Sequence, residues 1–108
     1  MIAIQDIKRN GHAALKLAGD LTIYTAQEAR DAFTACLERK HGPAECDLGE
    51  VEEIDTAGVQ VLFWFRREAV SRGQTLAFTN HSPAVIDVFD LLKVAALFGD
   101  PILIHPSR

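Results

Sequence analysis

Short runs of aliphatic residues open the chain, and residues 12–18 show the period of two that is typical of a strand with one buried face. Residues 2–8 form a similar run, and the Asn10-Gly11 pair between the two favours a two-residue hairpin turn. We therefore expect the chain to begin with a β-hairpin. Gly19-Asp20 is expected to break the second strand.

A helical pattern follows over residues 25–40. Thr25 and Glu28 have the spacing of a capping box, in which each side chain accepts a hydrogen bond from a free amide of the first turn. Gly42 is expected to form a left-handed helix cap, with Pro43 beyond it. The apolar positions recur at spacings of three and four: Ala26, Ala29, Phe33, Cys36 and Leu37.

The remaining chain alternates between strand and helix patterns. Residues 44–48 (AECDL) form a third strand candidate, and residues 49–54 lead from it to a helix that begins at Thr56 and ends at Arg72-Gly73. One stripe of that helix comprises Val59, Leu62, Phe63, Arg66 and Val70. The last elements are a strand over residues 74–80, a helix capped by Ser82 with Pro83 in its first position, and a strand over residues 101–105.

This order of elements predicts an α/β fold, with helices packed on a mixed, mostly parallel sheet that is opened by an antiparallel hairpin. The length of 108 residues is enough for one hydrophobic core, and no repeat or linker divides the chain. We therefore expect residues 1–108 to form a single domain.

Composition and charge exclude several classes of function. The formal net charge is −4, and the 11 Lys and Arg residues are scattered, so no basic stripe favours nucleic acid. No segment approaches the ~20 apolar residues of a membrane helix, and the N-terminus lacks a signal-peptide pattern. We expect a cytoplasmic protein without membrane insertion. Cys36 and Cys46 lack metal-ligand spacing and are expected to be reduced and buried.

Sequence motifs of catalysis are missing. None of the four histidines accompanies a recognisable nucleophile signature, and neither a GxGxxG nor a GxxxxGK[ST] motif occurs. We therefore expect neither enzymatic activity nor a cofactor nor a metal site.

Thr56 lies at the kind of position where ligands bind and modifications occur in α/β folds. It follows a strand and begins a helix, where free amides and the helix dipole favour negative charge. A phosphate there would add about −1.5 to −2 charges, which Asp55 beside it would repel, as would Glu52 and Glu53 if they come close. From these residues alone, the ordinary interpretation of Asp55 and Thr56 as helix caps is favoured, since such caps are frequent.

Three motifs in order resemble the STAS domain family, which includes bacterial anti-sigma factor antagonists. They are Gly19-Asp20-Leu21, Asp55-Thr56-Ala57-Gly58 and Ser82-Pro83-Ala84-Val85. The resemblance covers nearly the whole chain, and the combination is specific although each motif alone is not. For an antagonist, the resemblance implies that an anti-sigma Ser/Thr kinase phosphorylates the hydroxyl residue at the position of Thr56. The unphosphorylated form of the antagonist binds that kinase.

Two positions depart from the antagonist pattern: Ala57 replaces a second hydroxyl residue, and Thr22 replaces an acidic one. Residues 19–26 (GDLTIYTA) and 54–58 (IDTAG) are more similar to small stand-alone STAS proteins. Some of these resemble the accessory subunit of the lipid-asymmetry ABC transporter, where the Thr binds the ATPase subunit, and others accompany chemotaxis proteins. An ATPase partner is therefore the alternative to a kinase-type partner.

The resemblance implies a protein-binding surface around the candidate phosphorylation site Thr56. The expected contact residues come from the loop before the first helix, the start of the second and the corner before the last. They are Asp20, Thr22, Tyr24, Asp55, Thr56, Ala57, Gly58 and Ser82.

Overall fold

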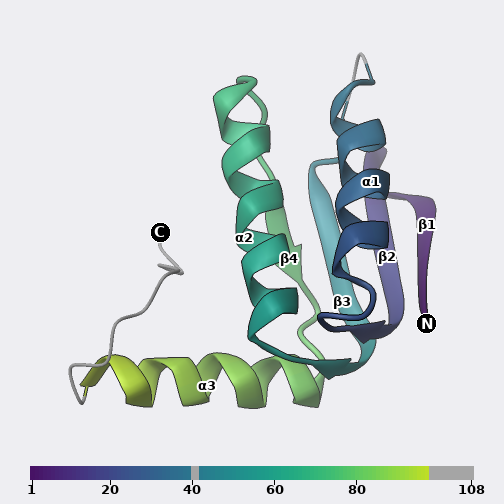
Figure 1. Cartoon of the computed structure of the whole chain (residues 1–108). Helices are drawn as coiled ribbons and strands as arrows, with labels where there is room; N and C mark the ends of the chain where they lie inside the picture. The colour runs from purple at the N-terminus through teal and green to yellow at the C-terminus, as the bar shows by residue number, and fades with distance from the viewer. Residues whose placement is uncertain (40–41, 98–108) are drawn as a thin grey trace.

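A computed structural model describes residues 1–39 and 42–97 of the chain, which form four strands and three helices (Figure 1). The sheet order is β1-β2-β3-β4, in which β1 and β2 are antiparallel and the other two pairs are parallel. This architecture confirms the predicted α/β fold. The elements are β1 (Ile2–Arg9), β2 (His12–Leu21), α1 (Ala26–Leu37), β3 (Glu45–Ile54), α2 (Thr56–Ser71), β4 (Ala77–Thr79) and α3 (Pro83–Leu97).

The core lies between the sheet and the helices α1 and α2, which run side by side over one face of it (Figure 1). Phe33 of α1 and Phe65 of α2 are fully buried, and their rings stack with centroids 4.1 Å apart. Helix α3 crosses one end of the sheet and contacts β3. Cys36 and Cys46 are free and buried, as expected, and burial raises the pKa of both thiols.

The hairpin forms where it was predicted. Asn10 and Gly11 both have positive φ angles, of 53° and 81°, as the tight turn requires. The predicted break at Gly19-Asp20 is wrong, because β2 continues to Leu21 through an irregularity in its pairing with β3. Gly19 has a φ of 99°, and the carbonyl of Met1 occupies the space that a Cβ would need. Both the positive φ and the Met1 carbonyl therefore favour glycine at this irregularity.

Helix α1 differs from the prediction at both ends. Thr25 occupies the N-cap position, but its side chain accepts no capping hydrogen bond, so the predicted capping box is wrong. The helix ends at Leu37, and Glu38 is its C-cap. Gly42 lies five residues beyond that end, so it is not the cap that the sequence predicted. The hydroxyl of Thr25 instead forms hydrogen bonds with the backbone of the preceding residues.

Strand and helix lengths after α1 also depart from the sequence pattern. The third strand includes the segment 49–54, whereas β4 has only three residues. Helix α2 ends as predicted, with Gly73 at a φ of 75°, but Val70 is 61% exposed and Ala69 is buried in its place. Ser82 caps α3, as predicted, by accepting a hydrogen bond from the Val85 amide at 3.2 Å. The predicted strand over residues 101–105 lies outside the described residues.

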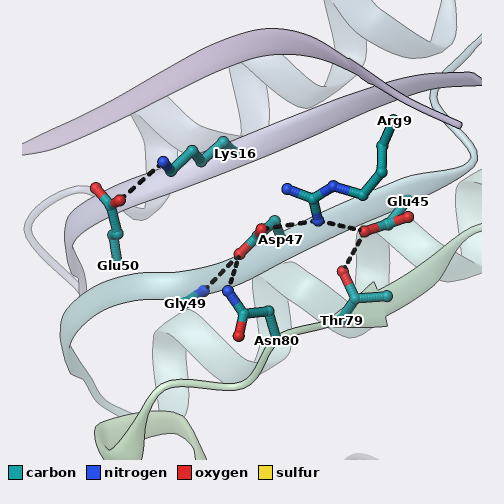
Figure 2. A network of polar contacts seen from close by, with 8 residues as sticks. All are labelled: Arg9, Lys16, Glu45, Asp47, Gly49, Glu50, Thr79 and Asn80. Atoms are coloured by element: carbon teal, nitrogen blue, oxygen red, sulfur yellow. Dashed lines mark hydrogen bonds and ion pairs between the residues drawn. The ribbon is translucent and has the colours of Figure 1, made fainter.

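The sheet face opposite α1 and α2 carries a polar network centred on Asp47 (Figure 2). This buried carboxylate lies 2.9 Å from the Arg9 guanidinium and accepts hydrogen bonds from the Gly49 amide and the Asn80 side chain. Burial alone would raise the pKa of Asp47, but these hydrogen bonds and the Arg9 charge together lower it. The network holds β1, β3 and the segment after β4 together.

Candidate partner-binding site

Two segments that are distant in the sequence meet at the end of the sheet where β2 and β3 finish (Figure 1). One is the loop of residues 22–25 between β2 and α1, and the other is the start of α2. Parallel pairing brings Leu21 opposite Ile54, so the residues that follow each strand emerge next to one another. The Asp55 amide then donates to the Leu21 carbonyl at 3.4 Å, which extends this contact into the connection.

Asp55 connects both segments through its carboxylate. Oδ1 accepts a hydrogen bond from the Gly58 amide at 2.9 Å, which is the N-cap contact that the sequence predicted. Oδ2 accepts a second hydrogen bond, at 3.0 Å, from the amide of Ile23. Both carboxylate oxygens of the candidate contact residue Asp55 thus accept hydrogen bonds from backbone amides of other residues of the chain.

The loop of residues 22–25 is fixed by hydrogen bonds among its own residues. The Thr25 hydroxyl accepts from the Thr22 amide at 3.0 Å and donates to the Asp20 carbonyl at 2.8 Å. The Thr22 hydroxyl accepts from the Tyr24 amide at 3.3 Å. Thr22 and Thr25 are both buried, so these two threonines shape the loop from inside, and Thr22 presents little surface to a partner.

The tip of this loop presents apolar side chains to solvent. Tyr24 is 94% exposed and Ile23 is 67% exposed, although residues of this size and polarity usually find at least partial cover. Thr56, the first residue of α2, is also exposed. Tyr24 and Thr56 were both predicted as contact residues, whereas Ile23 lies within the predicted stretch of residues 20–24 but was not singled out. Two adjacent large apolar residues in a loop were the available signal for it.

Ala57 and Gly58 lie behind this surface. Ala57 is half-buried and Gly58 is buried. A Cβ atom on Gly58 would overlap with the carbonyl oxygen of Leu21 and lie 3.0 Å from Cγ1 of Ile54. Gly58 therefore allows α2 to approach the end of β2 closely, which is a packing role.

Asp20 and Ser82 stand at the margins of the site. Asp20 is half-buried on β2, and its carboxylate lies 3.5 Å from the amino group of Met1. Ser82 is only 4% exposed, and its hydroxyl caps α3. In the part of the chain that the structure describes, no hydrogen bond connects Ser82 with the loop of residues 22–25 or with Asp55. The structure thus places six of the eight predicted residues at the junction of β2, β3 and α2 and the seventh, Asp20, beside it.

Two acidic residues near the end of β3 precede the start of α2. Glu52 and Glu53 are exposed, and neither takes part in an ion pair among residues 1–39 and 42–97. Within the same ranges no group of His, Cys, Asp and Glu side chains has the arrangement of a metal site. None of the helices described is long and apolar enough to cross a membrane.

Comparison with solved structures identifies the class of fold. An anti-sigma factor antagonist from Mycobacterium paratuberculosis is similar with a TM-score of 0.70 and 20% identity, over 95% of this chain and 88% of that one. The anti-sigma factor antagonist SpoIIAA in its unphosphorylated form gives a TM-score of 0.60 and 17% identity, over 82% and 83%. The Bacillus cell fate determinant SpoIIAA in its phosphorylated form gives a TM-score of 0.60 and 16% identity, over 87% of this chain and 86% of that one.

The family follows from a second comparison. The family model described as "Mlab, STAS domain" matches residues 5–103, which is most of the chain. The chain therefore belongs to the STAS domain family, as its three motifs indicated. No curated protein matches it significantly. STAS domains of the anti-sigma antagonist fold are generally non-enzymatic and have a role in protein interaction.

Proposed function

We propose that this chain is a cytoplasmic protein-interaction switch whose contact surface comprises Ile23, Tyr24 and Thr56. The observation that carries the proposal is the juxtaposition of an exposed hydroxyl residue with an exposed apolar loop tip, 94% exposed at Tyr24. Large aromatic side chains frequently anchor protein interfaces. A hydroxyl residue on a helix N-terminus is a suitable place for a regulatory phosphate. We take residues 1–108 as one STAS domain.

In the first form of the proposal, an anti-sigma or signalling Ser/Thr kinase binds this surface and phosphorylates Thr56. The modification would place about two negative charges next to Asp55, in a segment that also contains the exposed Glu52 and Glu53. The added charge changes the surface without requiring a change of fold. Thr56 is exposed, and the close contact of α2 with the end of β2 is made at Gly58. Loss of the partner is the expected result.

A second candidate is an accessory subunit that binds the ATPase of a lipid-transport ABC transporter through the same surface. Ala57 favours it, because the second hydroxyl residue of the antagonist pattern is absent and the residue is half-buried. The resemblance of residues 19–26 and 54–58 to the transporter-associated STAS proteins supports the same candidate. Thr56 then contacts the ATPase and carries no phosphate.

The two candidates are separated by capture of the tagged chain from its own cells, followed by mass spectrometry of the bound proteins and of Thr56. Thr56→Glu is compared with Ser71→Glu, which likewise replaces a hydroxyl side chain by a carboxylate, at an exposed residue at the far end of α2. A kinase-type partner that is lost only with Thr56→Glu, together with phosphate on Thr56, supports the first candidate. An ATPase subunit with unmodified Thr56 supports the second. A partner retained by both variants contradicts the proposed surface.

A further inference from the structure

The carboxylate of Asp55 does more than a helix cap requires. One oxygen is enough to accept the capping hydrogen bond, which here comes from the Gly58 amide at 2.9 Å. The other oxygen accepts from the Ile23 amide at 3.0 Å, in a loop 32 residues earlier in the sequence. Asp55 thus joins the loop tip to the start of α2 directly beside Thr56.

The other hydrogen bonds of the loop do not reach α2. Those of Thr22 and Thr25 close the loop on itself and on Asp20. The Asp55 amide binds the Leu21 carbonyl before the loop begins. Among the described residues, the bond from Ile23 to Asp55 is therefore the side-chain hydrogen bond that joins the loop tip to the residue before Thr56.

Negative charge on Thr56 acts on this contact. A phosphate on the first residue of α2 repels the adjacent carboxylate and can accept hydrogen bonds from the same free helix amides. Both effects displace the Asp55 carboxylate from its two donors. The Ile23 amide is at the surface, so water replaces the lost acceptor and the loop is released while the core stays intact.

We propose that Asp55 is a positioning residue that holds Ile23 and Tyr24 beside Thr56, and that charge on Thr56 regulates the partner surface by releasing this hold. The proposal rests on the proposed function for the role of Thr56 as the control point. It differs from a direct effect of the charge on the partner, because here the loop changes before any partner is present.

Asp55→Asn tests the hold in the isolated chain. An asparagine caps a helix as well as an aspartate does, but its amide offers one acceptor oxygen in place of two. Solvent exchange of backbone amides is measured by NMR, with the unfolding midpoint as a second readout. We expect exchange at Ile23 to rise at least about fivefold, while Gly58, Thr25 and the midpoint change little. Unchanged exchange at Ile23 would overturn the proposal and leave Asp55 as a cap only.

Thr56→Glu tests the regulatory step with the same measurement. It should raise exchange at Ile23 in the wild-type background and have no further effect in the Asp55→Asn background. An equal increase in both backgrounds would show that the charge does not act through Asp55. Both results are independent of the proposed function, whose own failure would appear as a captured partner that tolerates Thr56→Glu and Tyr24→Ala.

Discussion

Replacement of Gly58 by alanine should destabilise the protein, although alanine is the better helix former. Alanine in a helix is favoured over glycine by about 1 kcal/mol. The new methyl group would, however, overlap with the Leu21 carbonyl oxygen and lie 2.9 Å from its carbon and 3.0 Å from Cγ1 of Ile54. Backbone cannot move away as a flexible side chain can, so the penalty should reach the upper end of the ~1–3 kcal/mol typical of overpacking.

The two terms leave a net loss of about 1–2 kcal/mol, which corresponds to a decrease in Tm of about 5–10 °C for a chain of this size. Thermal unfolding followed by circular dichroism measures it. Gln60→Ala, at an exposed position two residues further along α2, is the matched control and should leave Tm unchanged. If Gly58→Ala proves as stable as the wild type or more so, the close approach of α2 to β2 is not as described.

Two further predictions concern stability. Phe33→Ala should lower the free energy of unfolding, measured in urea, by about 3–5 kcal/mol, because it empties a fully buried site and removes the stacking on Phe65. Tyr24→Ala, at a position that is 94% exposed, should change it by no more than about 0.5 kcal/mol. Asp47→Asn should lower the free energy of unfolding by about 1–3 kcal/mol near pH 7. Because the folded-state pKa of Asp47 is lowered from 3.8, the difference between the two proteins should shrink as the pH falls below about 4. A difference independent of pH, or an equal loss for the exposed Asp6→Asn, would contradict that assignment.

Local chemistry explains which parts of the fold were predictable. Asn10-Gly11 determines its own turn, because the positive φ angles of such a turn select these residue types. Asp55 caps α2 through a residue three positions away, so its role also follows from a short stretch of sequence. The alternation of strands and helices depends on similar short-range periodicity. The fold class was therefore predictable from the residues.

Long-range contacts explain the features that the sequence did not reveal. Gly19 has its positive φ where it pairs with Ile2 of β1 and where the carbonyl of Met1, just before that strand, leaves no room for a Cβ, so the irregularity depends on contacts that are distant in the sequence. Thr25 has the spacing of a capping box, but its hydroxyl is used by Asp20 and Thr22 in the loop. The bond from Ile23 to Asp55 spans 32 residues. Its two partners can be linked only once β2 and β3 are paired.

The role of Thr56 is tested most directly by the affinity of the purified partner for three forms of the chain. These are the wild type, Thr56→Glu and the matched control Ser71→Glu, whose exposed hydroxyl residue lies at the other end of α2. We predict that Thr56→Glu weakens binding at least about tenfold, as expected when a charge is placed at the centre of an interface, and that Ser71→Glu binds as the wild type does. Equal affinities for all three forms would contradict a partner surface at the start of α2.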